Sequence, residues 1–214
     1  MGPVKPRRPY SSALRTEQAR QTRARILDAA QGVFAQRGYA SSTIEAIALE
    51  AGVAVDTVYA GFGSKRALLS ALMDVRVGGD AEPVDLLDRS GPQAVRREPD
   101  QQRQVEAFAT DITSIIERAR PVDDIMRGAA AVDSEIAALR ARIQERRFQN
   151  MLKFVSWVTA NGPLRGRMSE EAAATIVWSL TSPEMHRLLR VDRGWTMERY
   201  TEWLAETLTL TLLP

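Results

Sequence analysis

Apolar residues recur at three- and four-residue intervals along most of the chain, which is the spacing of amphipathic α-helices. In the N-terminal third, the residues between these segments suit helix ends. Thr43 and Ser64 can cap the start of a helix, and Gly38 and Gly52 can adopt the positive φ that often follows one. The predicted helices cover residues 16–37, 44–51, 53–59 and 64–77. Helical periodicity therefore accounts for nearly all of this region.

The helical pattern resumes after an interruption. Residues 79–100 contain Pro83, Pro92 and Pro99 and few large apolar side chains, so we predict a linker there. The helices predicted beyond it are one through 105–116, one that Pro121 opens, one through 136–158, one that Ser169 caps and that runs to 180, and a last one that Thr196 caps. Residues 208–213 alternate like a strand, but a lone strand would have no partner, so we assign them to the last helix. The fold class is all-α.

Charge is segregated along the chain. Residues 1–77 contain 11 Lys and Arg against 6 Asp and Glu, whereas residues 78–214 contain 18 against 21, and together they give the net charge of +2. The first residues combine Pro and Gly with basic side chains and are predicted to be a disordered arm. A basic N-terminal third on a slightly acidic remainder suggests that the N-terminal part meets a polyanion.

Composition excludes several kinds of protein. The chain has no Cys and one His, His186, which removes disulfides and leaves almost nothing for a metal site. There is no apolar run of the ~18 residues that a membrane span needs, so we expect a cytoplasmic protein with no membrane partner. The segment GFGSK at 61–65 lacks the spacing of a phosphate-binding loop. We therefore predict no enzyme activity, no cofactor and no metal.

Residues 44–61 fit a helix-turn-helix at several independent points. The fifth position is Ala48, where two crossing helices leave room only for a small side chain, and the ninth is Gly52, where the turn needs positive φ. Ile47, Val53 and Val58 supply the small core that fixes the crossing. A generic helical hairpin with a Gly turn would show the same features, so the motif alone leaves both alternatives open.

The flanking sequence resembles the TetR family of bacterial transcriptional repressors over about residues 16–77. The segments that carry the resemblance are RILDAAQGVFAQRGYASSTI at 25–44, TIEAIALEAGVAVD at 43–56 and TVYAGFGSKRALL at 57–69. The residues in register with family positions are Phe34, Gly38, Thr43, Ala48, Gly52, Val53, Thr57, Tyr59, Phe62, Lys65 and Leu68. Residues 175–208 look like the ligand-binding domain of one subgroup, with a looser match.

The resemblance implies that residues 53–59 form the recognition helix in the major groove. The DNA-binding residues predicted on this basis are Thr43, Val55, Asp56, Thr57, Tyr59, Ala60 and Lys65, together with Arg7 and Arg8 of the arm. Asp56 can accept a hydrogen bond from cytosine, and Thr43, Thr57 and Lys65 match positions that contact phosphate. Gly61 departs from the family pattern, where a larger residue often contacts the backbone, so one phosphate contact is expected to be missing.

The resemblance also implies roles for the C-terminal helices. The residues predicted to line an effector pocket are Phe108, Ile112, Met126, Met151, Phe154, Trp157, Trp178 and Met185. Those predicted to form a dimer interface are Ile176, Val177, Leu180, Tyr200, Trp203, Leu204 and Leu208. Apolar side chains at helical spacing are also what an ordinary core contains. For His186, a hydrogen-bonded or exposed imidazole is favoured over contact with a ligand.

These observations predict an all-α homodimer with an N-terminal helix-turn-helix DNA-binding domain and a larger C-terminal helical domain for ligand binding and dimerisation. The predicted boundaries are an arm at 1–15, the DNA-binding domain at 16–63, a connecting helix at 64–78, a linker at 79–100 and the C-terminal domain at 101–214. The expected function is a repressor released from a palindromic DNA operator by a small apolar or aromatic effector. The alternative is a helical binding module whose basic face serves a partner other than DNA.

Overall fold

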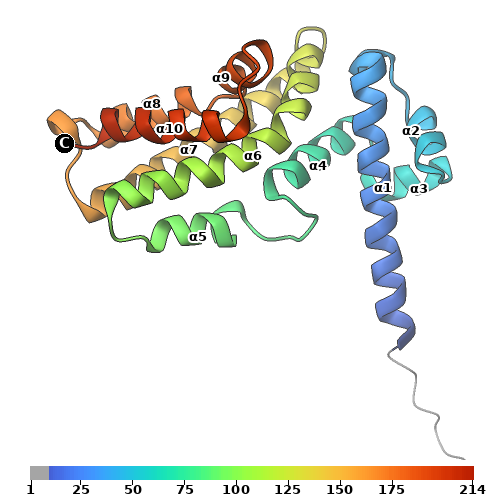
Figure 1. The fold of residues 1–214 in the computed structure, drawn as a ribbon. Coiled ribbons are helices and arrows are strands. Elements are labelled where there is room, and N and C mark those ends of the chain that lie inside the picture. The colour runs from blue at the N-terminus through green and yellow to red at the C-terminus, as the bar shows by residue number, and fades with distance from the viewer. Residues whose placement is uncertain (1–9) are drawn as a thin grey trace, which may run out of the picture. The chain divides into compact units, whose positions relative to one another are not determined.

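The computed structural model describes residues 10–214, and all regular secondary structure in that range is helical (Figure 1). The chain divides into two compact units after Leu72, and we refer to residues 10–72 as the N-terminal unit and 73–214 as the C-terminal unit. The helices of the N-terminal unit are α1 Tyr10–Ser41, α2 Ile44–Ala51 and α3 Val55–Phe62, followed by α4 Lys65–Gly78, which crosses the division. The predicted all-α class is confirmed.

Local signals set the helix ends of the N-terminal unit. The Thr43 hydroxyl accepts a hydrogen bond from the Ala46 N–H at 3.2 Å, and the Ser64 hydroxyl accepts one from the Ala67 N–H at 3.1 Å. Gly52 ends α2 with φ 64° and ψ 41°, the left-handed conformation that favours glycine. All three predicted helix ends are confirmed. The core between the helices is apolar and includes Ile26, Phe34, Ile47, Ala48, Val58, Leu68, Leu69 and Leu72.

The first helix is longer than predicted at its N-terminal end. It begins at Tyr10, so residues 10–15 are helical and do not belong to a disordered arm, which corrects that boundary. Residues 13–21 are rich in good helix formers such as Ala, Leu, Arg, Glu and Gln, and Arg20 pairs with Glu17 one turn away at 2.8 Å. At the other end, Gly38 has φ 73° and ψ 158°, which is not helical, so the positive φ predicted for Gly38 is confirmed, and residues 39–41 form a short segment beyond this kink.

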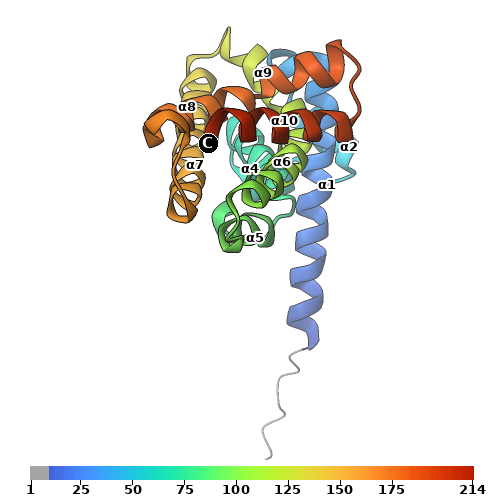
Figure 2. The same ribbon diagram turned by 60° about the vertical axis from the view of Figure 1, so that its left-hand side comes forward.

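The C-terminal unit is built on two long helices, α6 Gln101–Ala130 and α7 Ser134–Asn161. Helix α10 Met197–Leu212 packs on α6 and helix α8 Glu170–Leu180 packs on α7, while α6 and α7 pack on each other (Figures 1 and 2). Between α8 and α10 lie the short α9 Pro183–His186 and a π-helical segment, Arg187–Asp192. The prediction that residues 208–213 belong to the last helix is confirmed as far as Leu212, and Leu213 lies after the helix end.

Two predictions about this unit were wrong. The predicted linker contains a helix, α5 Ser90–Arg97, because Val95 buries its side chain against α6 at 2% exposure and so joins the core. Pro121 lies inside α6 and does not start a new helix. A proline in a helix interior costs about 3 kcal/mol, but Val122 and Met126 after it are fully buried in the same helix, and that burial keeps it continuous.

Candidate nucleic-acid interface and ligand pocket

Helix α3 presents a polar and small-residue face to solvent. Asp56, Thr57, Tyr59 and Ala60 are exposed, whereas Val58 on the other side of the helix is fully buried. Val55 is half-buried. The exposed side chains can accept from a base amine, donate a hydroxyl and contact a thymine methyl group, as major-groove recognition requires. The structure therefore brings together the predicted base-contacting residues, and Arg7 and Arg8 lie outside the described residues.

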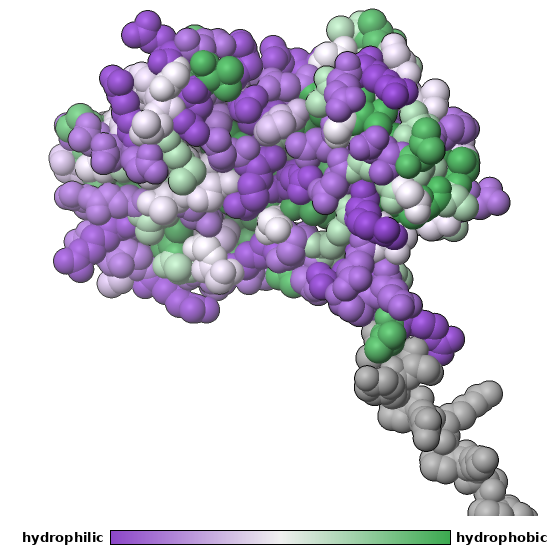
Figure 3. Space-filling view, turned by 45° about the vertical axis from the view of Figure 1, so that its right-hand side comes forward, coloured by the Kyte–Doolittle hydropathy of each residue, from purple (hydrophilic) through white to green (hydrophobic). Residues whose placement is uncertain are grey.

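Exposed apolar side chains accompany these groups. Leu49 on α2 is 84% exposed and Tyr59 on α3 is 47% exposed. In the space-filling view, apolar patches interrupt the polar surface of the N-terminal unit (Figure 3). Such side chains in a small domain suit a surface that another molecule covers.

Lys65 is placed differently from the prediction. Its ammonium donates to the carbonyl oxygens of Tyr39 and Ser42, both at 2.8 Å, and lies 4.3 Å from the centre of the Tyr39 ring. Two of its three donors therefore hold the end of α1 to the start of α4. The structure thus gives Lys65 a role in folding, and its contact with phosphate stays a prediction.

Arg23 positions the end of α3. It donates to the carbonyl oxygen of Gly61 at 3.2 Å, and its guanidinium carbon lies 4.3 Å from the centre of the Phe62 ring. A cation beside the last carbonyl groups of a helix also interacts favourably with the negative end of the helix dipole. Arg23 thus fixes the C-terminal end of α3 to α1, and Gly61 takes part through its backbone.

Thr43 and Thr57 remain candidates for phosphate contacts. The Thr43 hydroxyl accepts from the backbone as a cap, and the same side chain forms a hydrogen bond with the Glu45 carboxylate, which lowers the pKa of Glu45. Thr57 is exposed in the second position after the start of α3. No side chain caps that helix start, so the N-terminal N–H groups of α3 are open to an anion as well.

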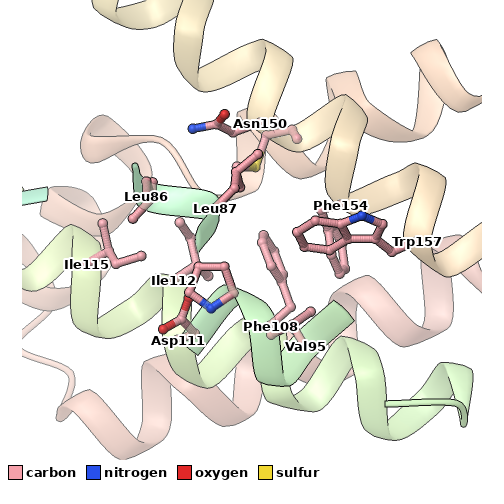
Figure 4. Close-up of a pocket in the computed structure, with 12 residues that line it drawn as sticks. Leu86, Leu87, Val95, Phe108, Asp111, Ile112, Ile115, Asn150, Phe154 and Trp157 are labelled. Carbon is pink, nitrogen blue, oxygen red and sulfur yellow. The ribbon is translucent and has the colours of Figure 1, made fainter. Parts of the chain in front are cut away.

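The C-terminal unit contains an apolar pocket between α5, α6 and α7 (Figure 4). Five of the eight predicted pocket residues line it: Phe108, Ile112, Met151, Phe154 and Trp157. The lining is completed by Leu86, Leu87, Pro92, Val95, Asp111, Ile115 and Asn150. The cavity has a volume of about 30 Å³, so a ligand larger than one or two water molecules would have to displace side chains.

The other three predicted pocket residues lie elsewhere, which corrects their assignment. Met126 is fully buried in the core, and Met185 lies on α9. Trp178 faces α7, where the Arg147 guanidinium carbon lies 4.8 Å from its ring centre and Phe148 meets it edge-on. Burial lowers the pKa of Arg147 to about 10. These side chains belong to the packing of α6, α7, α8 and α9.

Two polar residues of the pocket were missed. Asp111 and Asn150 make no hydrogen bond or ion pair with the residues that the structure describes. Burial raises the pKa of the Asp111 carboxyl, and the positive charge of Arg118 opposes this shift. Asp111 lies three residues after Phe108 in α6, so helical spacing alone could have placed it beside the predicted pocket face.

Side chains of α6 and α7 reach the C-terminal end of α4 within the same unit. Arg118 donates to the carbonyl oxygens of Arg76 at 3.2 Å and Val77 at 3.4 Å, and Arg146 pairs with Asp74 at 3.0 Å. Helix α6 also carries pocket residues. A change in the pocket that moves α6 would therefore act directly on α4 through these contacts.

Four of the seven predicted interface residues are fully buried inside a single chain: Val177, Tyr200, Leu204 and Leu208. They pack in the core of the C-terminal unit and are not available to a partner, which corrects their assignment. Helical periodicity identified the apolar face but not the surface against which it packs. Ile176, Leu180 and Trp203 are half-buried, and Leu210 on α10 is 70% exposed.

His186 is fully buried, with Nε2 2.9 Å from a carboxylate oxygen of Glu117 and its ring edge-on to Tyr200 at 4.9 Å. Arg190 and Arg120 are the other charged groups acting on it. Burial lowers the pKa of His186 below its usual 6.5, and the Glu117 carboxylate opposes that shift. The imidazole is therefore a buried packing group, in line with the expectation that it is not primarily a ligand contact.

We expect acid to destabilise the C-terminal unit partly through His186. The unfolded state binds a proton at the imidazole more readily than the folded state, so stability is present above about pH 6.5 and is lost as pH falls through the lowered pKa. Melting temperatures of the wild type and His186→Gln at about pH 7 and about pH 5.5 test this. The wild type should show the larger drop, and equal drops would contradict the expectation.

Among the described residues, no cluster of three metal-ligating side chains is present, and no helix is long and apolar enough to cross a membrane. Residues 26–72 match the family model described as bacterial regulatory proteins, tetR family. The HTH-type transcriptional regulator TtgR of Pseudomonas putida is 43% identical over 58 residues, which is 27% of this chain and 28% of that protein. The chain thus matches little more than a quarter of the length of this relative.

Solved structures are similar over nearly the whole chain. NalD, the secondary repressor of the MexAB-OprM multidrug efflux pump in Pseudomonas aeruginosa, has a TM-score of 0.68 at 22% identity, covering 92% of this chain and 98% of NalD. FadR of Bacillus subtilis in complex with stearoyl-CoA has a TM-score of 0.66 at 16% identity, covering 86% of this chain and 96% of FadR. At these identities the likeness shows the shared fold.

Proposed function

Residues 26–72 carry the N-terminal module of the bacterial regulatory proteins of the tetR family, and from this premise we propose that the chain is a DNA-binding transcriptional regulator that responds to a small molecule. The observation that carries the proposal is the exposed face of α3, supported by the α2–α3 geometry that Ala48 and Gly52 fix. The N-terminal unit then contacts the operator, and the C-terminal unit binds the effector and a second copy of the chain.

Ligand response follows from linkage. Suppose that α6 and α4 have one arrangement that binds the operator and another that does not. A ligand that binds the pocket more tightly in the second arrangement lowers operator affinity, and the size of the effect is set by the ratio of its affinities for the two arrangements. Arg118 supports this, since it joins the pocket helix to the last carbonyls of α4. Two related structures, SmeT in complex with triclosan and FadR in complex with stearoyl-CoA, hold a small molecule in the same fold.

A second copy would add a second half-site on a palindromic operator. We place the contact on the outer faces of α8 and α10. Trp203 and Leu210 are seven residues apart and share one side of α10, away from Leu204 and Leu208, and Ile176 lies on the exposed side of α8. This arrangement retains Ile176, Leu180 and Trp203 from the predicted interface.

The proposal is tested by capturing fragments of the host genome on the purified chain and sequencing them. A regulator enriches a few fragments that share an inverted repeat, and its affinity falls steeply with salt because phosphate contacts release counterions. The alternative, a binding module for another partner, predicts no enriched sequence. Enrichment of random fragments with no common repeat would contradict the proposal.

Asp56 should determine part of the sequence preference. Its carboxylate is exposed in the first turn of α3 and can accept from a cytosine amine, so Asp56→Ala should relax the preference at one base pair of each half-site by about 1–2 kcal/mol. The dependence of affinity on salt should not weaken, because a carboxylate contributes no phosphate contact. Selection from a randomised operator library measures this, with Asp88→Ala in the C-terminal unit as the control. An unchanged preference would exclude Asp56 from the base contacts.

A further inference from the structure

We propose that residues 80–94 form a hinged lid over the pocket of the C-terminal unit, and that an apolar ligand enters by lifting it. The lid comprises the segment after α4, the 3₁₀ turn η1 Leu86–Asp88 and the start of α5. The inference rests on the proposed function in one respect, that this pocket is the ligand site. It goes beyond that function because it names the wall of the pocket that moves and the place where it hinges.

The size of the pocket requires one wall to move. Ten of its twelve lining side chains are apolar, yet its volume of about 30 Å³ has room for no more than one or two water molecules. Helices α6 and α7 form one wall, and they also pack on each other, on α8 and on α10. The lid forms the opposite wall with Leu86, Leu87 and Pro92 (Figure 4). Since the long helices are held from several sides, the lid is the wall that can yield.

The lid is attached to the helices beneath it by side-chain packing. Among the described residues, none in 80–94 makes a hydrogen bond or an ion pair with α6 or α7. Arg89 instead braces the lid internally, since it pairs with Asp80 at 2.8 Å and donates to the Glu82 carbonyl oxygen at 3.0 Å. Leu86 and Leu87 are only half-buried. A segment held by so few contacts opens at a lower free energy than the core around it.

The end of the lid at Val95 is anchored by buried amides. The Gln104 side chain is fully buried and donates to the Val95 carbonyl oxygen at 3.0 Å. The Asn161 amide donates to the Glu98 carbonyl oxygen at 2.9 Å and to the Gln104 amide oxygen at 3.0 Å. Helix α5 is therefore fixed to α6 and α7 from Val95 onward. A helix of only eight residues is marginal by itself, so its first turn can unwind just before this anchor.

The other end of the lid follows a glycine. Gly79 lies between α4 and the lid and has φ 88°, a conformation that favours glycine. The backbone there can rotate without a side chain to restrict it. The lid thus lies between a flexible position after α4 and a hydrogen-bonded anchor in α5, which is the arrangement that a hinged movement needs.

Gly91 allows the lid to close on α6. A Cβ at position 91 would lie 1.9 Å from Oδ1 and 2.7 Å from Cγ of Asp111. A larger residue at 91 would therefore hold the lid away from α6. The same close approach makes it possible to lock the lid, because Cγ of Asp111 is the atom that a Cys sulfur would replace and lies within reach of a disulfide.

The test uses the variant Gly91→Cys/Asp111→Cys in the full chain, which contains no other Cys. Stopped-flow fluorescence follows the entry of the neutral apolar dye N-phenyl-1-naphthylamine, and mass spectrometry verifies the bridge. Oxidation should slow entry at least about tenfold, and reduction should restore it, because the bridge joins the lid to α6. Asp111→Cys alone cannot form the bridge, so its entry rate should not depend on the oxidant.

A second pair of variants tests the lid without a disulfide. Leu87 lines the pocket, whereas Val84 lies in the lid, is 46% exposed and does not line the pocket. Leu87→Ala should speed dye entry about threefold, because it removes part of the packing that holds the lid closed, and Val84→Ala should leave the rate unchanged. Equal effects of the two variants would contradict the proposal.

Hydrogen exchange on the full wild-type chain measures opening directly. Amides of 80–94 should exchange at least about tenfold faster than those of 104–116 in α6, and the oxidised bridge should slow them. Equal protection of the two segments would overturn the proposal. So would equal dye entry in the oxidised and reduced double variant, or failure of the wild type to bind the dye. None of these measurements involves DNA, so the lid and the proposed DNA-binding function can fail separately.

Discussion

Leu208→Glu should unfold the C-terminal unit, whereas Leu210→Glu, two residues further along α10, should leave it folded and separate two copies of the chain. Leu208 is fully buried in the core of that unit, and Leu210 is 70% exposed. A carboxylate at 208 would be buried without a partner, which costs several kcal/mol, on the order of 4 or more. At 210 it would remain in solvent in a single chain and would be buried only between two copies.

Circular dichroism on heating and light scattering distinguish the two variants. Leu208→Glu should lose cooperative melting of the C-terminal unit. Leu210→Glu should melt as a folded monomer and should lose operator affinity, because the two half-sites no longer add their free energies. A dimer that survives Leu210→Glu would place the interface elsewhere, and a folded Leu208→Glu would contradict the observed core.

Lys65→Met should destabilise the N-terminal unit by on the order of 3 kcal/mol. The variant keeps the length of the side chain but removes two hydrogen bonds from an ammonium to the carbonyl oxygens of Tyr39 and Ser42 and its contact with the Tyr39 ring. The junction between the end of α1 and the start of α4 should open. Hydrogen exchange of residues 10–72, followed by mass spectrometry on the full chain, measures the loss of protection there.

The control for Lys65 is Arg37→Ala, which removes an exposed cation from α1. It should change exchange little. The rival role for Lys65, a phosphate contact, makes a different prediction: protection stays as in the wild type while the salt dependence of DNA affinity falls by about one unit. That outcome would restore the sequence-based assignment and contradict the role argued from the structure.

The helix ends of the N-terminal unit were predictable because their causes are local. Thr43, Gly52 and Ser64 each act on backbone within three or four residues, so residue type and spacing suffice. The role of Lys65 was not predictable, because its acceptors are main-chain carbonyls 23 and 26 residues away. Every residue type has such a carbonyl, so residue type does not mark these two as acceptors. Sequence identifies donors, but the fold alone decides which carbonyls they meet.

The C-terminal unit shows the same limit for apolar positions. Periodicity correctly marked Val177, Leu204 and Leu208 as one continuous apolar face, but a face that packs inside the chain and one that packs on a second copy have the same spacing. Five pocket residues were brought together as expected because they lie on neighbouring turns of α6 and α7. Asp111 was missed because a lone acidic residue between apolar positions usually indicates a solvent-exposed position, although its spacing from Phe108 places it beside the pocket face.

The way that α3 is held has a consequence for engineering. Arg23 fixes its C-terminal end and Val58 its inner face, while the side chains of Asp56, Thr57 and Tyr59 make no hydrogen bond with the described residues. Scaffold and recognition surface are thus carried by different residues. A library that varies the exposed positions of α3 and keeps Arg23 and Val58 can be screened for new operators without loss of the fold, which makes this helix an exchangeable cassette for synthetic promoters.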